Sequence, residues 1–208
     1  MTAGQTAADL SAAVRAARGG DEAAFRLLYR EVQPGLLRYL RGLVGGEDAE
    51  DLASETWLQI ARDIRTFRDD GAGGFRGWAA TIGRHRALDH IRRMQRRPAP
   101  GLSAEVLVDL PDRNDTAEQA ITHAATNATV ELIATLPREQ AEAVLLRVVM
   151  GLDAQAVAAV MGKRPGAVRT AVWRGLRKLG ERLEETAVRE VAATGVTRTG
   201  GPTPRETS

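Results

Sequence analysis

Cysteine is absent from this 208-residue sequence, and aromatic residues make up only 4% of it. Without cysteine there are no disulfides, no thiolate nucleophile and no cysteine-based zinc site, which suits a reducing compartment. No run of about 18 apolar residues occurs, and the first residues lack the basic start and apolar block of a signal peptide. We therefore expect a cytoplasmic protein that inserts into no membrane. The hydrophobic share of 43% is nevertheless enough for a packed core.

Charge is almost balanced overall but is segregated along the sequence. The formal net charge is +2, yet residues 76–97 contain seven arginines and a single acid, and residues 163–182 contain seven basic residues and a single acid. Residues 47–55 contain five acids and no base. Two basic patches and one acidic patch indicate a polyanionic partner and a separate protein partner. Arginine favours bidentate contacts to phosphate and guanine, although a GC-rich genome would also enrich it.

Residues 154–183 have the pattern of a helix-turn-helix unit. A short helical pattern at 154–161 is followed by a turn at 162–166 and a longer helix at 165–183. One face of the longer helix is apolar at steps of three and four residues, and the other face is basic. The second helix of such a unit can enter the major groove of DNA, but a helical hairpin with solvated arginines would give the same pattern. The apolar positions are Val168, Val172, Leu176, Leu179 and Leu183.

The first hundred residues predict a series of helices. Asp21 can cap one of them, and Pro34 within it indicates a kink or a new helix start. A third helix is expected at 48–67 and a fourth at 75–96. The glycine-rich loop between them, at 68–74, does not match a phosphate-binding loop. The expected buried residues of the fourth helix are Phe75, Trp78, Ile82, Leu88 and Ile91.

A second helical domain follows a segment of different composition. Prolines and acids predict a mainly extended, flexible linker. No alternating β pattern of useful length occurs, so the expected fold is all-α, with two small helical domains joined by this acidic linker. The expected core of the second domain is Val130, Ile133, Leu136, Ala141, Val144, Leu145, Val148 and Val149. The expected divisions are an N-terminal extension at 1–20, a first domain at 21–97, the linker at 98–127, a second domain at 128–185 and a disordered tail at 186–208.

Taken in order, these motifs resemble the bacterial RNA polymerase sigma factors of the extracytoplasmic-function (ECF) type, group IV of the sigma-70 family. The segments FRLLYREVQPGLLRYLRGLVG, DAEDLASETWLQI and FRGWAATIGRHRALDHIRR resemble sigma region two. The segments LPREQAEAVLLRVVMGLDAQAVAAVMG and GAVRTAVWRGLRKL resemble sigma region four. The resemblance implies a helical bundle and a helix-turn-helix domain that bind core polymerase, recognise −10 and −35 promoter elements and promote DNA melting. It implies neither an enzymatic activity nor a cofactor.

The resemblance assigns the acidic helix to the polymerase. In the family this helix docks on the clamp coiled coil of the β′ subunit, and opposite charges there favour encounter and register. Acids at a helix start also satisfy the helix dipole, which is the simpler explanation for them. The residues carried over are Asp48, Asp51, Leu52, Glu55 and Trp57.

The glycine-rich loop and the helix after it correspond to the element that opens −10 DNA. A base must leave the duplex and enter a pocket, where aromatic and arginine side chains supply stacking and neutralise the backbone. Phe75 and Trp78 could instead be core residues. Asp89 could pair with Arg92 or Arg93 on its own helix. The expected −10 residues are Phe75, Trp78, Arg84, His85, Arg86, Asp89, Arg92 and Arg93. Histidine replaces the asparagine common in the family at position 85, so −10 specificity does not carry over.

The helix-turn-helix unit corresponds to the reader of the −35 element. Arg169 and Thr170 lie early on the recognition helix, where base contacts are expected, and the later basic residues suit phosphates. Alanine stands at 156, 167 and 171, where a glutamate, a hydroxyl residue and a basic residue are common, so the −35 contacts can differ as well. The expected −35 residues are Lys163, Arg164, Arg169, Thr170, Arg174, Arg177 and Lys178.

The resemblance also implies partners. These are core RNA polymerase through its β′ clamp and β flap, promoter DNA, and an anti-sigma factor. The linker resembles one that runs through the polymerase active-centre cleft, with a solvated tether as the alternative. A stand-alone dimeric helix-turn-helix regulator is the alternative function. An enzyme is disfavoured because the three histidines lack metal-ligand spacing and no nucleophile–base motif is present.

Overall fold

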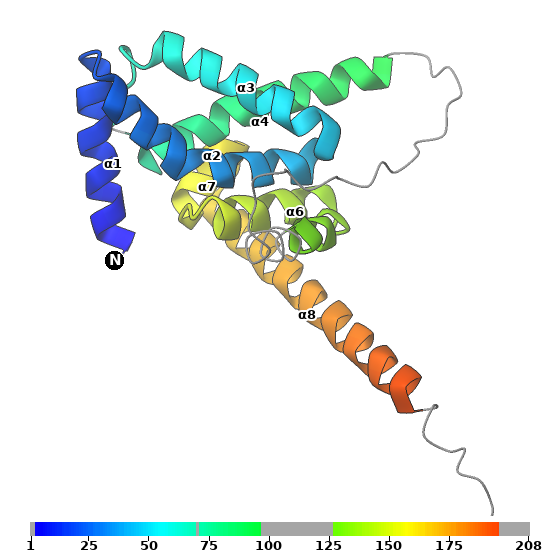
Figure 1. Ribbon diagram of the computed structural model, residues 1–208. Coiled ribbons are helices and arrows are strands. Elements are labelled where there is room, and N and C mark those ends of the chain that lie inside the picture. The colour runs from blue at the N-terminus through cyan, green and yellow to red at the C-terminus, as the bar shows by residue number, and fades with distance from the viewer. Residues whose placement is uncertain (1–2, 70, 97–126, 196–208) are drawn as a thin grey trace, which may run out of the picture.

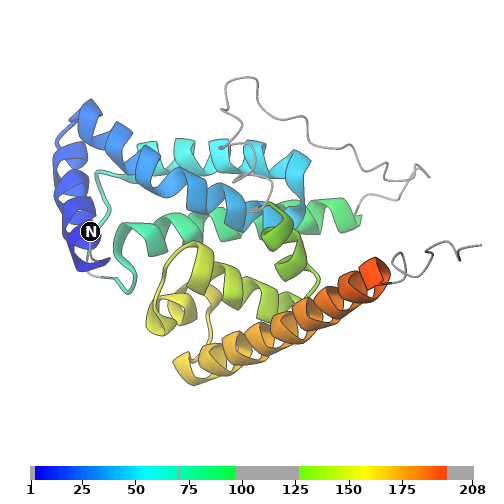
Figure 2. The same ribbon diagram turned by 60° about the horizontal axis from the view of Figure 1, so that its bottom comes forward.

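The computed structural model describes residues 3–69, 71–96 and 127–195, and every regular element within these ranges is a helix. The expected all-α fold is confirmed. The expected linker lies almost wholly outside the described residues. Figures 1 and 2 show one group of helices, α1 to α4, lying beside a second group, α6 to α8. The elements are α1 (Ala3–Arg18), α2 (Glu22–Val44), α3 (Gly46–Asp63), α4 (Gly74–Arg96), α6 (Arg138–Val144), η1 (Leu145–Val149), α7 (Ala154–Met161) and α8 (Pro165–Gly195). Residues 127–134, before α6, are helical as well.

Helix α2 begins where the sequence predicts. The Asp21 side chain accepts a hydrogen bond of 3.0 Å from the backbone N–H of Ala24, as a helix cap does. The helix then continues through Pro34, so no new helix starts there. The buried stripe of α2 runs along one face on both sides of the proline. Burial of this stripe outweighs the one backbone hydrogen bond that proline removes. The stripe consists of Leu28, Val32, Leu36, Tyr39 and Leu40.

Helix α1 forms most of the expected N-terminal extension. Leu10 and Val14 are buried at its contact with the neighbouring helices α2 and α4. The Ser11 hydroxyl donates a hydrogen bond of 2.5 Å to the Asp69 carboxylate, in the loop before α4. The N-terminal extension therefore supports the first domain and the glycine-rich loop.

Helix α4 packs through small residues rather than large ones. Phe75 is buried as expected, but Trp78, Ile82, Leu88 and Ile91 are only half-buried. A Cβ atom at Gly83 would lie 3.0 Å from Leu36 Cδ1, so α4 lies too close to α2 for large side chains on this face. The residues that replace the expected set in the interior are Ala79, Ala80, Gly83 and Ala87.

An aromatic cluster fills the other side of the first domain. Its ring centroids are separated by 4.7 to 6.2 Å in tilted or edge-on pairs, the geometries that aromatic rings prefer. The cluster joins the start of α4 to α2 and α3. Its members are Phe25, Tyr29, Trp57, Phe67, Phe75 and Trp78.

The second domain departs from the expected helix at η1, a π-helical turn that continues α6. The Met150 N–H donates to the Leu145 carbonyl over five residues, at 3.1 Å. Because a π turn carries an extra residue, the helix face rotates. The expectation that Val148 is a core residue is wrong, since its exposure is 58%. Met150 and Leu152 are buried instead.

Helix α8 buries a different face from the predicted one and is longer than predicted. Its buried face includes Val168, Gly175 and Leu179, whereas Leu176 and Leu183 are 47% and 57% exposed. A Cβ atom at Gly175 would lie 2.8 Å from Val144 Cγ2, so close packing at this glycine rotates the helix away from the expected face. The helix continues to Gly195, which corrects the expectation of a disordered tail from residue 186. Figure 1 shows its last turns extending away from the other helices.

Candidate functional site

The expected polymerase-binding residues divide between the surface and the core of α3. Asp51 and Glu55 are exposed and Asp48 is half-exposed, so the acids lie on the outer side of the helix. Leu52 and Trp57 are 3% and 7% exposed and belong to the core. The Trp57 indole N–H donates a hydrogen bond of 2.6 Å to the Gln33 side chain. The surface of α3 is therefore mainly acidic, and its apolar members support it from below.

The acids of α3 contact the basic helix α4. His90 Nε2 lies 3.1 Å from Asp48 Oδ2, and Arg86 Nη1 lies 3.9 Å from Glu55 Oε2. Arg86 also donates a hydrogen bond of 2.9 Å to the Gln59 side chain. These contacts join the acidic surface of α3 to the basic surface of α4.

The outer face of α4 gathers most of the expected −10 residues. A surface hollow of about 430 Å³ is lined by Arg86, Asp89, Arg92, Arg93 and Arg96. Arg92 Nη2 lies 3.1 Å from Asp89 Oδ1, so the alternative pairing of Asp89 with its own helix does form. His85 is exposed on the same helix. The concentration of arginine suits an anionic ligand longer than one phosphate.

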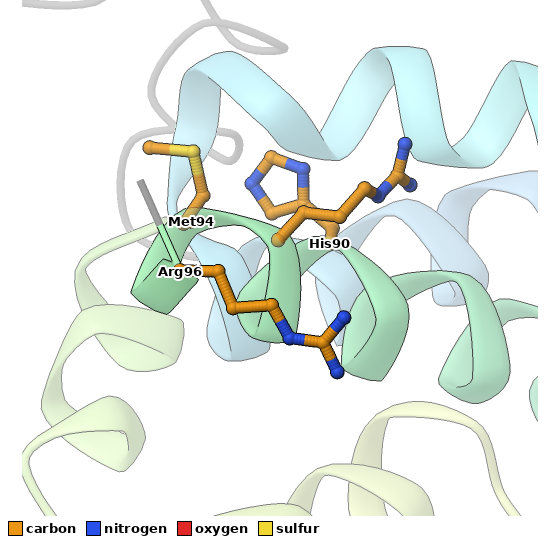
Figure 3. Close-up of a pocket in the computed structure, with 4 residues that line it drawn as sticks. His90, Met94 and Arg96 are labelled. Atoms are coloured by element: carbon orange, nitrogen blue, oxygen red, sulfur yellow. The ribbon is translucent and has the colours of Figure 1, made fainter. Parts of the chain in front are cut away.

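A second hollow, of about 320 Å³, lies at the C-terminal end of α4 and is lined by His90, Arg93, Met94 and Arg96. Figure 3 shows its side chains around the last turns of the helix, with the imidazole of His90 near α3. Met94 is 53% exposed, so this hollow offers an apolar surface beside its arginines.

Three expected −10 residues lie apart from this group. Phe75 is 3% exposed within the aromatic cluster, and Trp78 is half-buried beside it. Both therefore pack in the core, as the simpler explanation proposed, and only Trp78 retains an accessible part. The Arg84 side chain is only 20% exposed and contacts Glu142 of the second domain. In this structure Arg84 does not belong to the open basic face.

The helix-turn-helix geometry of the second domain follows from local signals. Asp153 caps α7 by accepting hydrogen bonds from the N–H groups of Gln155 and Ala156, at 2.9 and 2.7 Å. Gly162 ends the helix in the left-handed conformation, with φ of 65°, which glycine adopts without strain. Pro165 then occupies the first turn of α8, where its missing N–H costs nothing.

The expected −35 residues form one exposed surface along the first half of α8 and the turn before it. Thr170 donates a hydrogen bond of 3.1 Å to the Gly166 carbonyl. Arg177 pairs with Glu181 at 2.9 Å, and Lys163 pairs with Glu139 at 3.2 Å. The structure keeps these residues together: Lys163, Arg164, Arg169, Thr170, Arg174, Arg177 and Lys178 are all exposed.

Two exposed residues on these surfaces were missed. Trp173 is 59% exposed on α8, and the Arg177 guanidinium lies 5.4 Å from the centre of its ring. Its position four residues after Arg169 and four before Arg177 was the available signal. Leu58 is 59% exposed on α3, at seven-residue spacing from Asp51, and adds an apolar contact to the acidic face.

Together these surfaces define a class: a two-domain helical protein with one acidic face and two basic faces. The family models agree with this class. Sigma-70 region 2 matches residues 28–97, and Sigma-70, region 4 matches residues 126–179.

Curated relatives define the family more closely. The chain is 34% identical over 180 residues to the ECF RNA polymerase sigma factor SigD of Mycobacterium tuberculosis (strain H37Rv), with 84% of each chain covered. It is 33% identical over 176 residues to the ECF RNA polymerase sigma factor BldN of Streptomyces coelicolor, covering 84% of this chain and 66% of that protein. The chain belongs to the ECF sigma factors of the sigma-70 family, which are non-enzymatic transcription initiation factors of RNA polymerase. The dimeric-regulator alternative is not favoured.

Solved structures share the fold. The sigma factor RpoE of Bartonella quintana, in complex with the anti-sigma factor NepR, matches with a TM-score of 0.60 and 22% identity, covering 77% of this chain and 96% of that one. CnrH in complex with the cytosolic domain of CnrY matches with a TM-score of 0.59 and 20% identity, covering 83% and 96%. Among the described residues, no helix has the length and apolar character needed to cross a membrane.

Proposed function

We propose that this chain recruits core RNA polymerase through α3, opens −10 promoter DNA through α4 and the loop before it, and reads the −35 duplex through α8. The observation that carries the proposal is that the charged faces fall within the segments matched by the two family models. The acidic face and the first basic face lie within the region 2 match, and the second basic face lies within the region 4 match. The chemistry of each face suits the role that its region would give it.

The acidic face supports a polymerase contact because it has more acidic residues than the helix dipole of α3 accounts for. Asp51 and Glu55 project from the second and third turns of α3, beyond the first turn where the helix dipole acts most strongly. Leu58 continues the same face with an exposed apolar side chain. A face of this kind suits a basic coiled coil, with charge steering the encounter and leucine excluding water.

The basic faces support two kinds of DNA contact. The arginines around the hollow on α4 suit the backbone of separated strands, and the accessible part of Trp78 offers a stacking surface. On α8, Arg169 and Thr170 lie in the turns that reach base edges, and Trp173 adds an apolar contact beside them. Arg174 and Lys178 suit phosphates.

The remaining features of the proposed role follow from its class. The chain acts in the cytoplasm, where RNA polymerase acts, and catalyses no reaction itself. An anti-sigma factor regulates it by covering the polymerase-binding face. The sigma factor RpoE of Bartonella quintana was solved in complex with an anti-sigma factor, which supports this part of the proposal.

Run-off transcription tests the proposal directly. The purified chain and core polymerase are incubated with fragmented genomic DNA, and the transcript start sites are mapped. We expect discrete start sites with shared upstream elements near −10 and −35. If the folded chain yields no specific transcripts and instead shifts palindromic duplexes as a dimer at physiological salt, the regulator function replaces this one.

Charge reversal tests the assignment of the acidic face. Asp51→Arg should weaken binding to core polymerase by about tenfold or more, because one favourable charge contact becomes repulsive. Asp9→Arg is the matched control, since Asp9 is an exposed acid on α1. Equal loss in both variants would place the contact elsewhere.

Alanine substitution tests the two roles on α8. Arg169→Ala should cost about 1–3 kcal/mol and relax the preference for one −35 base, whereas Arg174→Ala should weaken all sequences alike and lower the salt slope by about 1. Binding is measured with the holoenzyme on promoter variants at several salt concentrations. A uniform loss for Arg169→Ala would reassign it to the phosphate backbone.

A further inference from the structure

Helix α1 lies outside the segment that the region 2 family model matches, yet it is packed into the first domain. The match begins at residue 28, whereas α1 ends at Arg18. Figure 2 shows α1 at the end of the first helical group, where α4 begins, and α1 contacts both α2 and α4. The residues of α1 that are buried in this contact are Leu10, Ala13, Val14 and Ala17. The helix is therefore a fixed part of the domain.

Ser11 is the side chain through which α1 reaches the glycine-rich loop. It directly follows the buried Leu10 and lies about one turn before the buried Val14, so packing holds its backbone in place. Its hydroxyl donates a hydrogen bond of 2.5 Å to Asp69 Oδ2. A hydrogen bond to a carboxylate is shorter and stronger than one between neutral groups. Ser11 thus ties one end of the loop to α1.

Asp69 connects this hydrogen bond to the start of α4. Its other oxygen, Oδ1, lies beside Gly74, because a Cβ atom at Gly74 would be only 3.1 Å from it. Gly74 is the first residue of α4, where the helix dipole favours a negative charge. The Asp69 carboxylate therefore contacts Ser11 with one oxygen and lies at the N-terminus of α4 with the other.

The end of the loop has a backbone shape that depends on glycine. Gly73 and Gly74 have φ angles of 85° and 54°, which side chains disfavour. A Cβ atom at Gly77 would lie 2.7 Å from the Ala72 carbonyl oxygen, so the loop folds directly onto the first turn of α4. Glycine also makes the unbound backbone flexible. An outside contact such as the one from Ser11 is therefore needed to keep the loop in one shape.

The two ends of the loop meet at Trp78. Phe67, just before the loop, packs on Trp78 with ring centroids 4.7 Å apart. Trp78 lies about one turn after Gly74 and is only half-buried. The stacking surface proposed above for a separated strand is thus bordered by both ends of the loop, and a shift of the loop would change the chain beside this surface.

We propose that Ser11 is a positioning residue for promoter melting: through Asp69 it holds the glycine-rich loop in the shape that receives the separated −10 strand. The inference rests on the proposed function. Ser11 acts through Asp69 and not by touching DNA itself. Helix α1 therefore influences how fast the chain opens DNA, whereas α3 and α8 keep their contacts without it.

Removal of the hydroxyl tests this role in the full chain. With core polymerase on a promoter mapped by run-off transcription, Ser11→Ala should slow open-complex formation by roughly three- to tenfold at saturating holoenzyme, since one hydrogen bond to a charged group is lost. Affinity for core polymerase and for the −35 duplex should not change. Ser11→Thr keeps a hydroxyl and should restore the rate. Asp69→Ala should slow opening as much, and the double Ser11→Ala, Asp69→Ala variant no more than either substitution alone.

The neighbouring position on α1 supplies the matched control. Ala12 is exposed, so a Ser11→Ala, Ala12→Ser variant moves the hydroxyl into solvent without changing the composition of the chain. This variant should open DNA as slowly as Ser11→Ala, and Ala12→Ser alone should open it at the wild-type rate. A wild-type rate for Ser11→Ala, or restoration of the rate by the moved hydroxyl, would overturn the proposal.

Hydrogen exchange of the chain without polymerase separates this inference from the proposed function. The N–H groups of Gly74 and Gly77 donate to the carbonyls of Gly71 and Gly73 at 3.2 and 3.0 Å. In Ser11→Ala these two amides should exchange at least about threefold faster, while those of α8 stay unchanged. Equal exchange in the variant and the wild type would overturn the positioning role. If exchange rises as expected but the wild-type chain gives no specific transcripts, the proposed function fails, and the role in melting fails with it.

Discussion

The two domains present their basic helices in different ways. On α4 the arginines contact protein partners: Arg84 binds Glu142 of α6, Arg86 contacts Glu55 and Gln59 of α3, and Arg92 pairs with Asp89. On α8, Arg169 and Arg174 project into solvent. The charges of Arg84, Arg86 and Arg92 are thus offset by acids of the chain itself. On α8 the same holds for Arg177, which pairs with Glu181, but Arg169 and Arg174 face solvent.

The side chains on which these two helices pack also differ. The start of α4 rests on an aromatic cluster, whereas α8 packs at Gly175 on the aliphatic side chains of Val144 and Leu136. Bulky rings hold the start of α4, whereas close approach at glycine positions both the middle of α4, at Gly83, and α8, at Gly175. A substitution that destabilises one domain should therefore disturb the basic helix of that domain before the basic helix of the other.

The largest expected effect comes from removing a ring of the aromatic cluster. Trp57→Ala should destabilise the first domain by about 3–5 kcal/mol, because the indole is buried and its N–H is hydrogen-bonded. Trp173→Ala, at an exposed tryptophan of the second domain, should change stability by less than about 0.5 kcal/mol. Domain-resolved hydrogen exchange measures both. Similar costs for the two variants would remove the distinction between the cores.

A bulkier side chain at Gly175 should loosen the support of α8. Gly175→Leu should cost the second domain about 1–3 kcal/mol, since its Cβ would already collide with Val144. Gly180→Ala is the control: no atom lies within 4 Å of its Cβ position, so it should stabilise the helix by up to about 1 kcal/mol. Thermal unfolding compares the pair, and a neutral Gly175→Leu would show that the helices can move apart freely.

Smaller and more similar effects are expected at the two helix caps. Asp21→Ala and Asp153→Ala should each cost about 1 kcal/mol, in the first and second domain respectively, because each aspartate accepts backbone N–H groups at a helix start. Denaturant unfolding followed by hydrogen exchange assigns each loss to a domain. A loss in both domains from one substitution would show that they unfold as a unit.

The smallest expected effect is a pH dependence of the domain contact at Tyr39. It should be seen only at alkaline pH. Burial, and then the Glu142 carboxylate, raise the pKa of Tyr39 well above its ordinary value. Because the folded pKa is the higher one, the hydroxyl stabilises the contact fully below the ordinary pKa, and this contribution is lost as pH rises through the raised pKa. In a Tyr29→Phe variant, tyrosinate absorbance should therefore appear only well above pH 10. Titration at the ordinary value would show an open contact.

Local signals in the sequence were sufficient for several features. The cap at Asp21 and the bounds of α7, between Asp153 and Gly162, follow from short-range hydrogen bonding and backbone preference. The separation of acidic and basic surfaces follows from helical periodicity and the charges themselves. Each of these depends on residues within a few positions, so the sequence contains the whole cause.

Other features depended on neighbours distant in the sequence. Helix α2 continues through Pro34 because its buried stripe holds both halves. Close packing selected Gly83 and Gly175 for the interior where larger residues were expected, and the π turn at η1 moved Val148 to the surface. The distance between two packed helices cannot be predicted from a local sequence pattern.

By itself, then, the sequence determined the helices, their caps, the family and the order of the charged surfaces, since these arise from local propensity and periodic charge. Only the tertiary structure decided which charged residues are available. Arg84 and Arg86 belong to one arginine-rich stretch, yet Arg84 is largely enclosed against Glu142 and Arg86 lines the open hollow. The physical reason is that packing brings Glu142, which is 58 residues away in the sequence, next to Arg84. An ion pair forms only where packing places a carboxylate beside the arginine.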